Sequence, residues 1–137
     1  MNQRNVLAQQ LEIVNQSLFY LLVIIASVLI SFCSTLIQRG QVEDALLGKP
    51  QRGAADVFPL RLTASALSLS ALVFFFCLAL RTCRDAAQGD DPAVQKSAGM
   101  NVWASAFVLT ASLIRLYDLN FTQAVQPSLA AENTQPE

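Results

Sequence analysis

The sequence contains no histidine, and this absence removes several kinds of chemistry at once. Histidine is the usual axial ligand of haem, the commonest metal ligand in proteins and the commonest general base near neutral pH. The three-helix subunits that anchor haem in respiratory complexes need such ligands, so the chain is not expected to be one of them. We therefore expect neither a haem nor a metal cofactor.

Cysteine is scarce as well, with three residues in 137. The spacing of Cys33, Cys77 and Cys83 matches no zinc or redox motif. The first two lie inside apolar runs and are interpreted as small packing residues. Cys83 lies just beyond such a run, where the alternative interpretation is a palmitoylation site.

Charge is low and evenly balanced, with 14% charged residues and a net charge of −1. The basic residues are scattered, so no positive surface for nucleic acid and no polybasic segment for anionic lipid is expected. The sequence also contains no glycine-rich phosphate loop, no nucleophile elbow and no metal-ligand spacing. These absences predict a protein that is not an enzyme.

Apolar sequence is what the chain does contain, with 53% hydrophobic residues and a mean hydropathy of +0.42. It is concentrated in three runs, 18–37, 62–80 and 97–114, and none of them contains a charged side chain. About 20 apolar residues in a helix cover the ~30 Å hydrocarbon core of a bilayer. The sequence therefore predicts an all-α integral membrane protein with three transmembrane helices.

The first helix is expected to begin well before its apolar run. Leu7, Leu11, Val14 and Leu18 fall on one helical face, and no glycine or proline interrupts the chain before Gly40. We expect a polar, amphipathic helix over 1–17 that continues into a transmembrane helix over 18–38. The apolar face of its N-terminal part either rests at the lipid headgroups or packs against a partner helix.

Turn signals divide the rest of the chain. Gly48 and the following Lys49-Pro50 end any helical turn after the first span, and Pro59 suits the first turn of the second helix. Asp91 is expected to cap a third helix that starts at Pro92. The segments expected from these signals are a loop over 39–58, a transmembrane helix over 59–83, a loop over 84–91, a helix over 92–120 that contains the third span, and a disordered tail over 121–137.

Three spans place the two termini on opposite sides of the membrane. Basic residues near the spans normally decide the orientation. Four flank the spans on the N-terminal side and five on the other, which leaves the orientation open. The two sets are Arg4, Arg81, Arg84 and Lys96, and Arg39, Lys49, Arg52, Arg61 and Arg115.

Each span carries small or hydroxylated residues at helical spacing. Such residues let helices approach closely in lipid, so the stripes predict helix packing; the alternative is a hydroxyl-lined path between subunits. The candidate packing residues are Ser27, Ser31 and Thr35 in the first span, Ala64, Ser68 and Ala71 in the second, and Ala104, Ser105, Ala111 and Ser112 in the third.

Aromatic and basic residues near the span ends are candidates for anchors at the membrane interface. Arg115 can also pair with Asp118 one helical turn later, and a gating or substrate role is the alternative for this arginine. The candidate anchors are Tyr20, Arg81, Arg84, Trp103, Arg115 and Tyr117.

The pattern predicts a small accessory, scaffold or assembly subunit that works through helix–helix contacts. Its expected partners are the lipid bilayer and either a second copy of the chain or a larger membrane protein. The alternative is a homo-oligomeric channel or pore, since the three-span topology and polar tail resemble one class of phage holins. A small membrane enzyme using interfacial carboxylates is the third hypothesis, with the candidates Asp85, Asp90, Asp91 and Asp118.

Overall fold

The chain folds into three long helices. The computed structural model describes residues 3–49 and 56–132, with the backbone alone for 126–132. The helices are α1 (Gln3–Leu46), α2 (Phe58–Ala87) and α3 (Pro92–Glu132), and the described residues include no strand. The all-helical prediction is confirmed, and each helix is long and apolar enough to cross a membrane.

The start of each later helix follows its local sequence. The Asp91 carboxylate accepts a hydrogen bond of 2.9 Å from the amide of Ala93, and α3 begins at Pro92, as the sequence predicts. Asp56 accepts a hydrogen bond of 3.0 Å from the amide of Phe58 where α2 begins. Both carboxylates satisfy an amide that has no partner within the first helical turn.

The end of α1 is set by Gly48. This glycine adopts a φ of 62°, a left-handed conformation that costs other residues free energy. The amide of Gly48 donates to the carbonyl of Ala45, and the amide of Lys49 donates to that of Asp44. These two bonds form a Schellman motif, which satisfies carbonyls left free at the helix end.

All three helices are longer than the sequence predicts. The predicted end of α1 at residue 38 is wrong, because α1 continues through Gly40 to Leu46. A single interior glycine weakens a helix but does not end it when helix-forming residues follow. The predicted loop over 39–58 is correspondingly shorter, and its residues 50–55 lie outside the described part of the chain.

The other two helices extend at their C-terminal ends. α2 runs to Ala87 instead of residue 83, which leaves 88–91 as the connection to α3. α3 continues to Glu132, whereas the sequence predicted a disordered tail from residue 121. No glycine or proline lies between Asn120 and Pro127 to end the helix earlier. Residues 133–137 of the expected tail lie outside the described residues.

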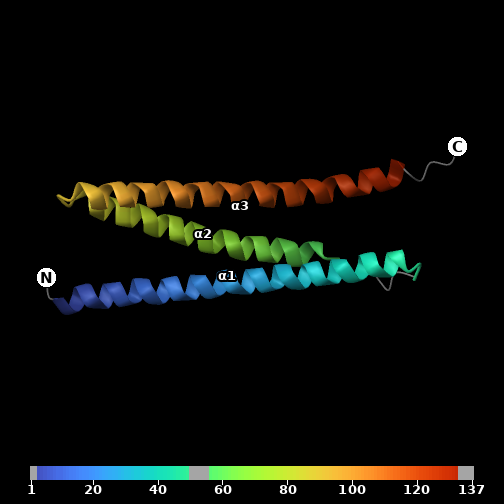
Figure 1. Ribbon diagram of the computed structural model, residues 1–137, viewed down its shortest axis with the longest axis horizontal. Coiled ribbons are helices and arrows are strands. Elements are labelled where there is room, and N and C mark those ends of the chain that lie inside the picture. Colours follow the sequence, from blue (N-terminus) through green and yellow to red (C-terminus); the bar gives the residue numbers. More distant parts are fainter. Residues whose placement is uncertain (1–2, 50–55, 133–137) are drawn as a thin grey trace.

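The helices form an open arrangement with α2 in the middle. Figure 1 shows α2 crossing diagonally between α1 and α3, beside α1 at its start and beside α3 at its end. α2 contacts both other helices, whereas α1 and α3 make no direct contact in the described part of the chain. The start of α1 and the end of α3 lie at opposite ends of the assembly.

The buried interior consists almost entirely of small side chains. Val57, three alanines of α2 and one of α3 are the buried apolar residues, and two serines of α1 are buried beside them. Most large apolar side chains instead point outward and are left uncovered. A fold that buries small residues and exposes large ones is typical of helices surrounded by lipid, where close backbone approach replaces hydrophobic burial.

Candidate functional site

The interface between α1 and α2 is built around two buried serines. Ser27 and Ser34 are each 1% exposed, and both lie on the side of α1 that faces α2. The hydroxyl of Ser27 donates to the carbonyl oxygen of Ile24 and lies 2.7 Å from the hydroxyl oxygen of Ser68. Because the Ser27 proton is used within α1, the Ser68 hydroxyl is the donor in the bond between the helices.

Ser34 has the same burial but a different environment. Its hydroxyl oxygen has no hydrogen-bond partner. The four-residue spacing of Ser27, Ser31 and Thr35 predicts these three as packing residues and does not include Ser34. The residues of α1 that face α2 recur every seven residues instead, at Tyr20, Ser27 and Ser34. This is the repeat expected where two helices pack at a small crossing angle.

The remaining α1 candidates lie away from the buried contact. Thr35 is exposed, and its hydroxyl donates to the carbonyl of Ser31 in its own helix. Ser31 is also exposed, but its side chain lines a cavity described below. Tyr20, expected as an interface anchor, stacks on Phe74 of α2 with ring centroids 4.1 Å apart. The ring of Tyr20 therefore contributes to packing between the helices.

In α2, the two predicted alanines occupy the most crowded positions. Ala64 is 3% exposed and Ala71 is fully buried. Because the side chain at each position is only a methyl group, the neighbouring backbone can approach α2 closely. Ser68 lies between them and is half-buried beside Ser27.

In α3, the serines and alanines of the predicted stripe separate. Ser105 and Ser112 are half-buried on the side that packs on α2, whereas Ala104 and Ala111 are exposed. Trp103 and Tyr117 lie on the outer side and are 68% and 73% exposed. Tyr117 lies just beyond the apolar run 97–114 and suits a ring at the membrane interface, whereas Trp103 lies within that run. Arg81 and Arg84 are exposed near the end of α2.

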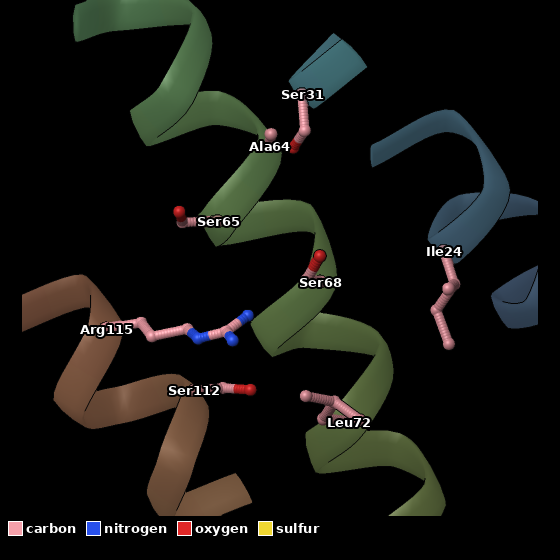
Figure 2. A pocket seen from close by; sticks show the side chains of 8 residues that line it. All are labelled: Ile24, Ser31, Ala64, Ser65, Ser68, Leu72, Ser112 and Arg115. Carbon is pink, nitrogen blue, oxygen red and sulfur yellow. The ribbon is translucent and has the colours of Figure 1, made fainter. Parts of the chain in front are cut away.

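A groove with residues from all three helices runs over α2. One part of this groove is a cavity of about 250 Å³, and most of the polar side chains of the groove line this cavity. Figure 2 shows Arg115 extending from α3 toward α2, between Ser65 and Ser112. The side chains that line this part are Ile24, Ser31, Ala64, Ser65, Ser68, Leu72, Ser112 and Arg115.

Arg115 thus lies in a place that the sequence analysis did not predict. The expected ion pair with Asp118 does not form, and among the described residues Arg115 makes no ion pair or hydrogen bond at all. Ser65 lines the same cavity. The sequence selects Arg115, but as an interface anchor. Ser65 is not selected, because the pairing of α3 with α2 sets its surroundings and it lies on no distinctive motif.

Among the described residues there is neither a cluster of metal ligands nor a disulfide. No group of three Cys, Asp or Glu side chains lies close enough to hold a metal ion in that part of the chain. Cys33, Cys77 and Cys83 are all free thiols. The features that remain for recognition are the groove and the uncovered faces of the helices. No protein-family model, curated protein or solved structure matches this chain, so its function has to be inferred from these features alone.

Proposed function

We propose that this protein is a non-enzymatic assembly subunit of a membrane, in which α1 binds a second membrane helix. That helix belongs either to another copy of the chain or to a larger membrane protein. The observation that carries the proposal is a continuous apolar stripe along α1 that nothing in the described structure covers. Its residues, 48–64% exposed, are Leu7, Leu11, Val14, Leu18, Leu22, Ile25, Leu29, Phe32 and Leu36.

The stripe follows the helical period and lies opposite the contact with α2. Steps of three and four residues average close to 3.6, so the side chains fall along one narrow face of a straight helix. At 100° per residue, this face lies on the far side of α1 from Ser27 and Ser34. α1 therefore contacts α2 with one face and leaves the opposite face uncovered, together with flanking side chains such as Phe19 and Val28.

The N-terminal part of the stripe favours a protein partner over lipid. Leu7, Leu11 and Val14 precede the apolar run that begins at Leu18, in a segment rich in asparagine and glutamine. Lipid chains can cover Ile25 or Phe32, but the same stripe continues beyond the residues that hydrocarbon would cover. A partner helix running beside α1 would cover both parts at once.

Cysteine crosslinking along α1 tests this proposal. The three native cysteines are first replaced by alanine, and single cysteines are introduced at Leu11, Val14 or Ile25. In native membranes we expect oxidation to link these variants to a second helix, while Gln9→Cys, on another side of the same segment, stays unlinked. A product of twice the chain mass identifies a second copy, and a heavier product identifies a larger partner.

Equal crosslinking at Leu11 and Gln9 would contradict a specific helix contact. Absence of any product, together with a monomer after purification in mild detergent, would overturn the proposal. Both results can be read without knowing the partner in advance.

A homo-oligomeric pore is the second candidate, and the hydroxyl groups around the groove favour it. Ser31, Ser65 and Ser112 come from three different helices and line one cavity. One monomer leaves this cavity open at the side, so an enclosed path would require several copies. We expect cysteines at Ser31, Ser68 and Ser105 to react with a small aqueous thiol reagent in intact vesicles if such a path exists. Complete protection of all three would exclude it.

A further inference from the structure

The groove over α2 changes from polar to apolar along its length. The polar cavity around Arg115 adjoins a second cavity of about 360 Å³, and the two share Ile24 and Leu72 in their linings. Apart from Ser105, the second cavity is lined by hydrocarbon side chains. Its other lining residues are Leu21, Phe75, Ala104 and Val108.

The polar end presents hydrogen-bond donors without a fixed acceptor. In the described part of the chain, Arg115 has no ion pair or hydrogen bond, and the hydroxyls of Ser65 and Ser112 have no hydrogen bond either. By contrast, Arg61, near the same end of the assembly, donates to the side-chain oxygen of Gln38. No carboxylate lines the cavity. A guanidinium with neighbouring hydroxyls suits an anion with several oxygens, such as a phosphate group.

The apolar end lies deeper along the same helix. Arg115 follows directly on the apolar run of α3, whereas Ala104 and Val108 lie in the middle of that run. The distance along the axis from residue 115 to residue 104 is about 16 Å, roughly half of a ~30 Å hydrocarbon core. In an inserted chain, the polar end would thus lie at the edge of the hydrocarbon and the apolar end near its centre.

We propose that this groove binds one anionic phospholipid. Its phosphate lies against Arg115, Ser65 and Ser112, and an acyl chain follows the groove past Leu72 toward Ala104. The negative headgroup complements the unpaired guanidinium, and the hydrocarbon lining complements the chain. A free phosphate could meet the polar end alone, but it would leave the apolar end unused. The site does not involve the free stripe of α1, so it stands independently of the proposed assembly role.

Lipid retention by the purified protein tests the site. The protein is reconstituted with equal amounts of phosphatidylglycerol and phosphatidylcholine, extracted in mild detergent and weighed with its bound lipid by native mass spectrometry. We expect one phosphatidylglycerol per chain. Arg115→Gln should weaken this binding about tenfold, as expected for loss of a charge-assisted contact. Ala104→Trp, which fills the apolar end and leaves the arginine in place, should also displace the lipid.

Two matched variants serve as controls. Arg39→Gln removes an exposed arginine that does not line the groove, and Ala124→Trp adds the same bulk at an exposed position on the opposite side of α3. Both should retain phosphatidylglycerol like the unmodified chain. Helical circular dichroism of every variant shows whether the fold is kept.

Three results would overturn the proposal. These are unchanged retention by Arg115→Gln, equal retention of phosphatidylcholine, and displacement of the lipid by inorganic phosphate at millimolar concentration. The last result would mean that the polar end binds a free anion without a chain.

Discussion

Two serines that are equally buried against α2 differ in what their hydroxyls bond. Ser27 is bonded both to its own helix and to Ser68, whereas the hydroxyl of Ser34 has no partner. In an apolar surrounding, a hydroxyl without a partner costs about 1–3 kcal/mol, while a bond between membrane helices contributes on average about 0.6 kcal/mol. The same residue type therefore has opposite effects on stability at two positions of one interface.

Replacing each serine by alanine separates these effects. We expect Ser27→Ala to lower the free energy of unfolding by about 0.6–1.7 kcal/mol. Ser34→Ala should leave it unchanged or raise it by about 1 kcal/mol, because the substitution removes an unsatisfied hydroxyl. Unfolding by increasing sodium dodecyl sulfate in mixed micelles, followed by circular dichroism, measures both. Equal destabilisation by the two variants would contradict the hydrogen-bond assignment.

Ala71 tests how closely the helices approach. It is fully buried, so the side chain of Ala71→Leu would have to push neighbouring helices apart. Overpacking of this kind costs about 1–3 kcal/mol. Ala66→Leu makes the same change at an exposed position of α2 and should alter stability little. The same detergent titration compares the two, and tolerance of leucine at residue 71 would mean that α2 is less tightly packed than the structure shows.

At the scale of the elements, the three helices and the start of α3 could be predicted, whereas the C-terminal ends of the helices could not. The apolar runs without charge are long enough to cross a membrane, and such runs can be recognised directly in the sequence. The end of α1 depends on the backbone conformation of two glycines. Gly40 lies inside the helix, whereas Gly48 has the left-handed φ that ends it. In the sequence, Gly48 is followed closely by Pro50, which favours a helix end there, whereas no such signal follows Gly40.

The two glycines provide a matched pair of substitutions. A Cβ at Gly40 meets no heavy atom within 4 Å, so Gly40→Ala should stabilise the C-terminal part of α1 by about 0.5–1 kcal/mol. Gly48→Ala places a side chain on a left-handed backbone and should destabilise the helix end by about 1–2 kcal/mol. Hydrogen exchange of the amides of residues 41–46 should slow in the first variant and accelerate in the second. The reverse order would place the helix end at Gly40.

The residues of the candidate site likewise divide into those that a local sequence pattern predicts and those whose role depends on contacts between helices. Ser27, Ala64, Ser68 and Ala71 could be selected because small residues at helical spacing are a local pattern. Their pairing, and the lack of a partner for Ser34, depend on the register between α1 and α2. That register is determined by contacts between residues some 40 positions apart, such as Ser27 with Ser68.

At the scale of the whole molecule, the outward-facing apolar side chains lead us to expect insertion into a bilayer, and the single tryptophan can test this expectation. Trp103 is 68% exposed on the outer side of α3. We expect phospholipids with brominated chains to quench its fluorescence in reconstituted vesicles. Quenching should be stronger with bromine near the chain end than near the headgroup, because Trp103 lies next to Ala104 in the middle of the apolar run of α3.

As a comparison, refolded protein is added to the outside of preformed vesicles, and the quenching of its tryptophan fluorescence is compared with that of the reconstituted protein. Equal fluorescence in brominated and ordinary lipid after full reconstitution would contradict contact between α3 and the bilayer. Stronger quenching from bromine near the headgroup would instead place Trp103 at the membrane interface.

α2 lies between two helices that do not contact each other among the described residues. The α1–α2 and α2–α3 interfaces can therefore contribute separately to the free energy of unfolding. α1 can leave α2 without breaking any contact of α3, so the two interfaces should contribute additively to stability, with negligible coupling between them. The short connection over 88–91 also joins α2 and α3 into a hairpin that can form before α1 docks. Assembly would then proceed in two steps. If α1 detaches as an intact helix, the face with Ser27 and Ser34 becomes exposed while the hairpin stays folded.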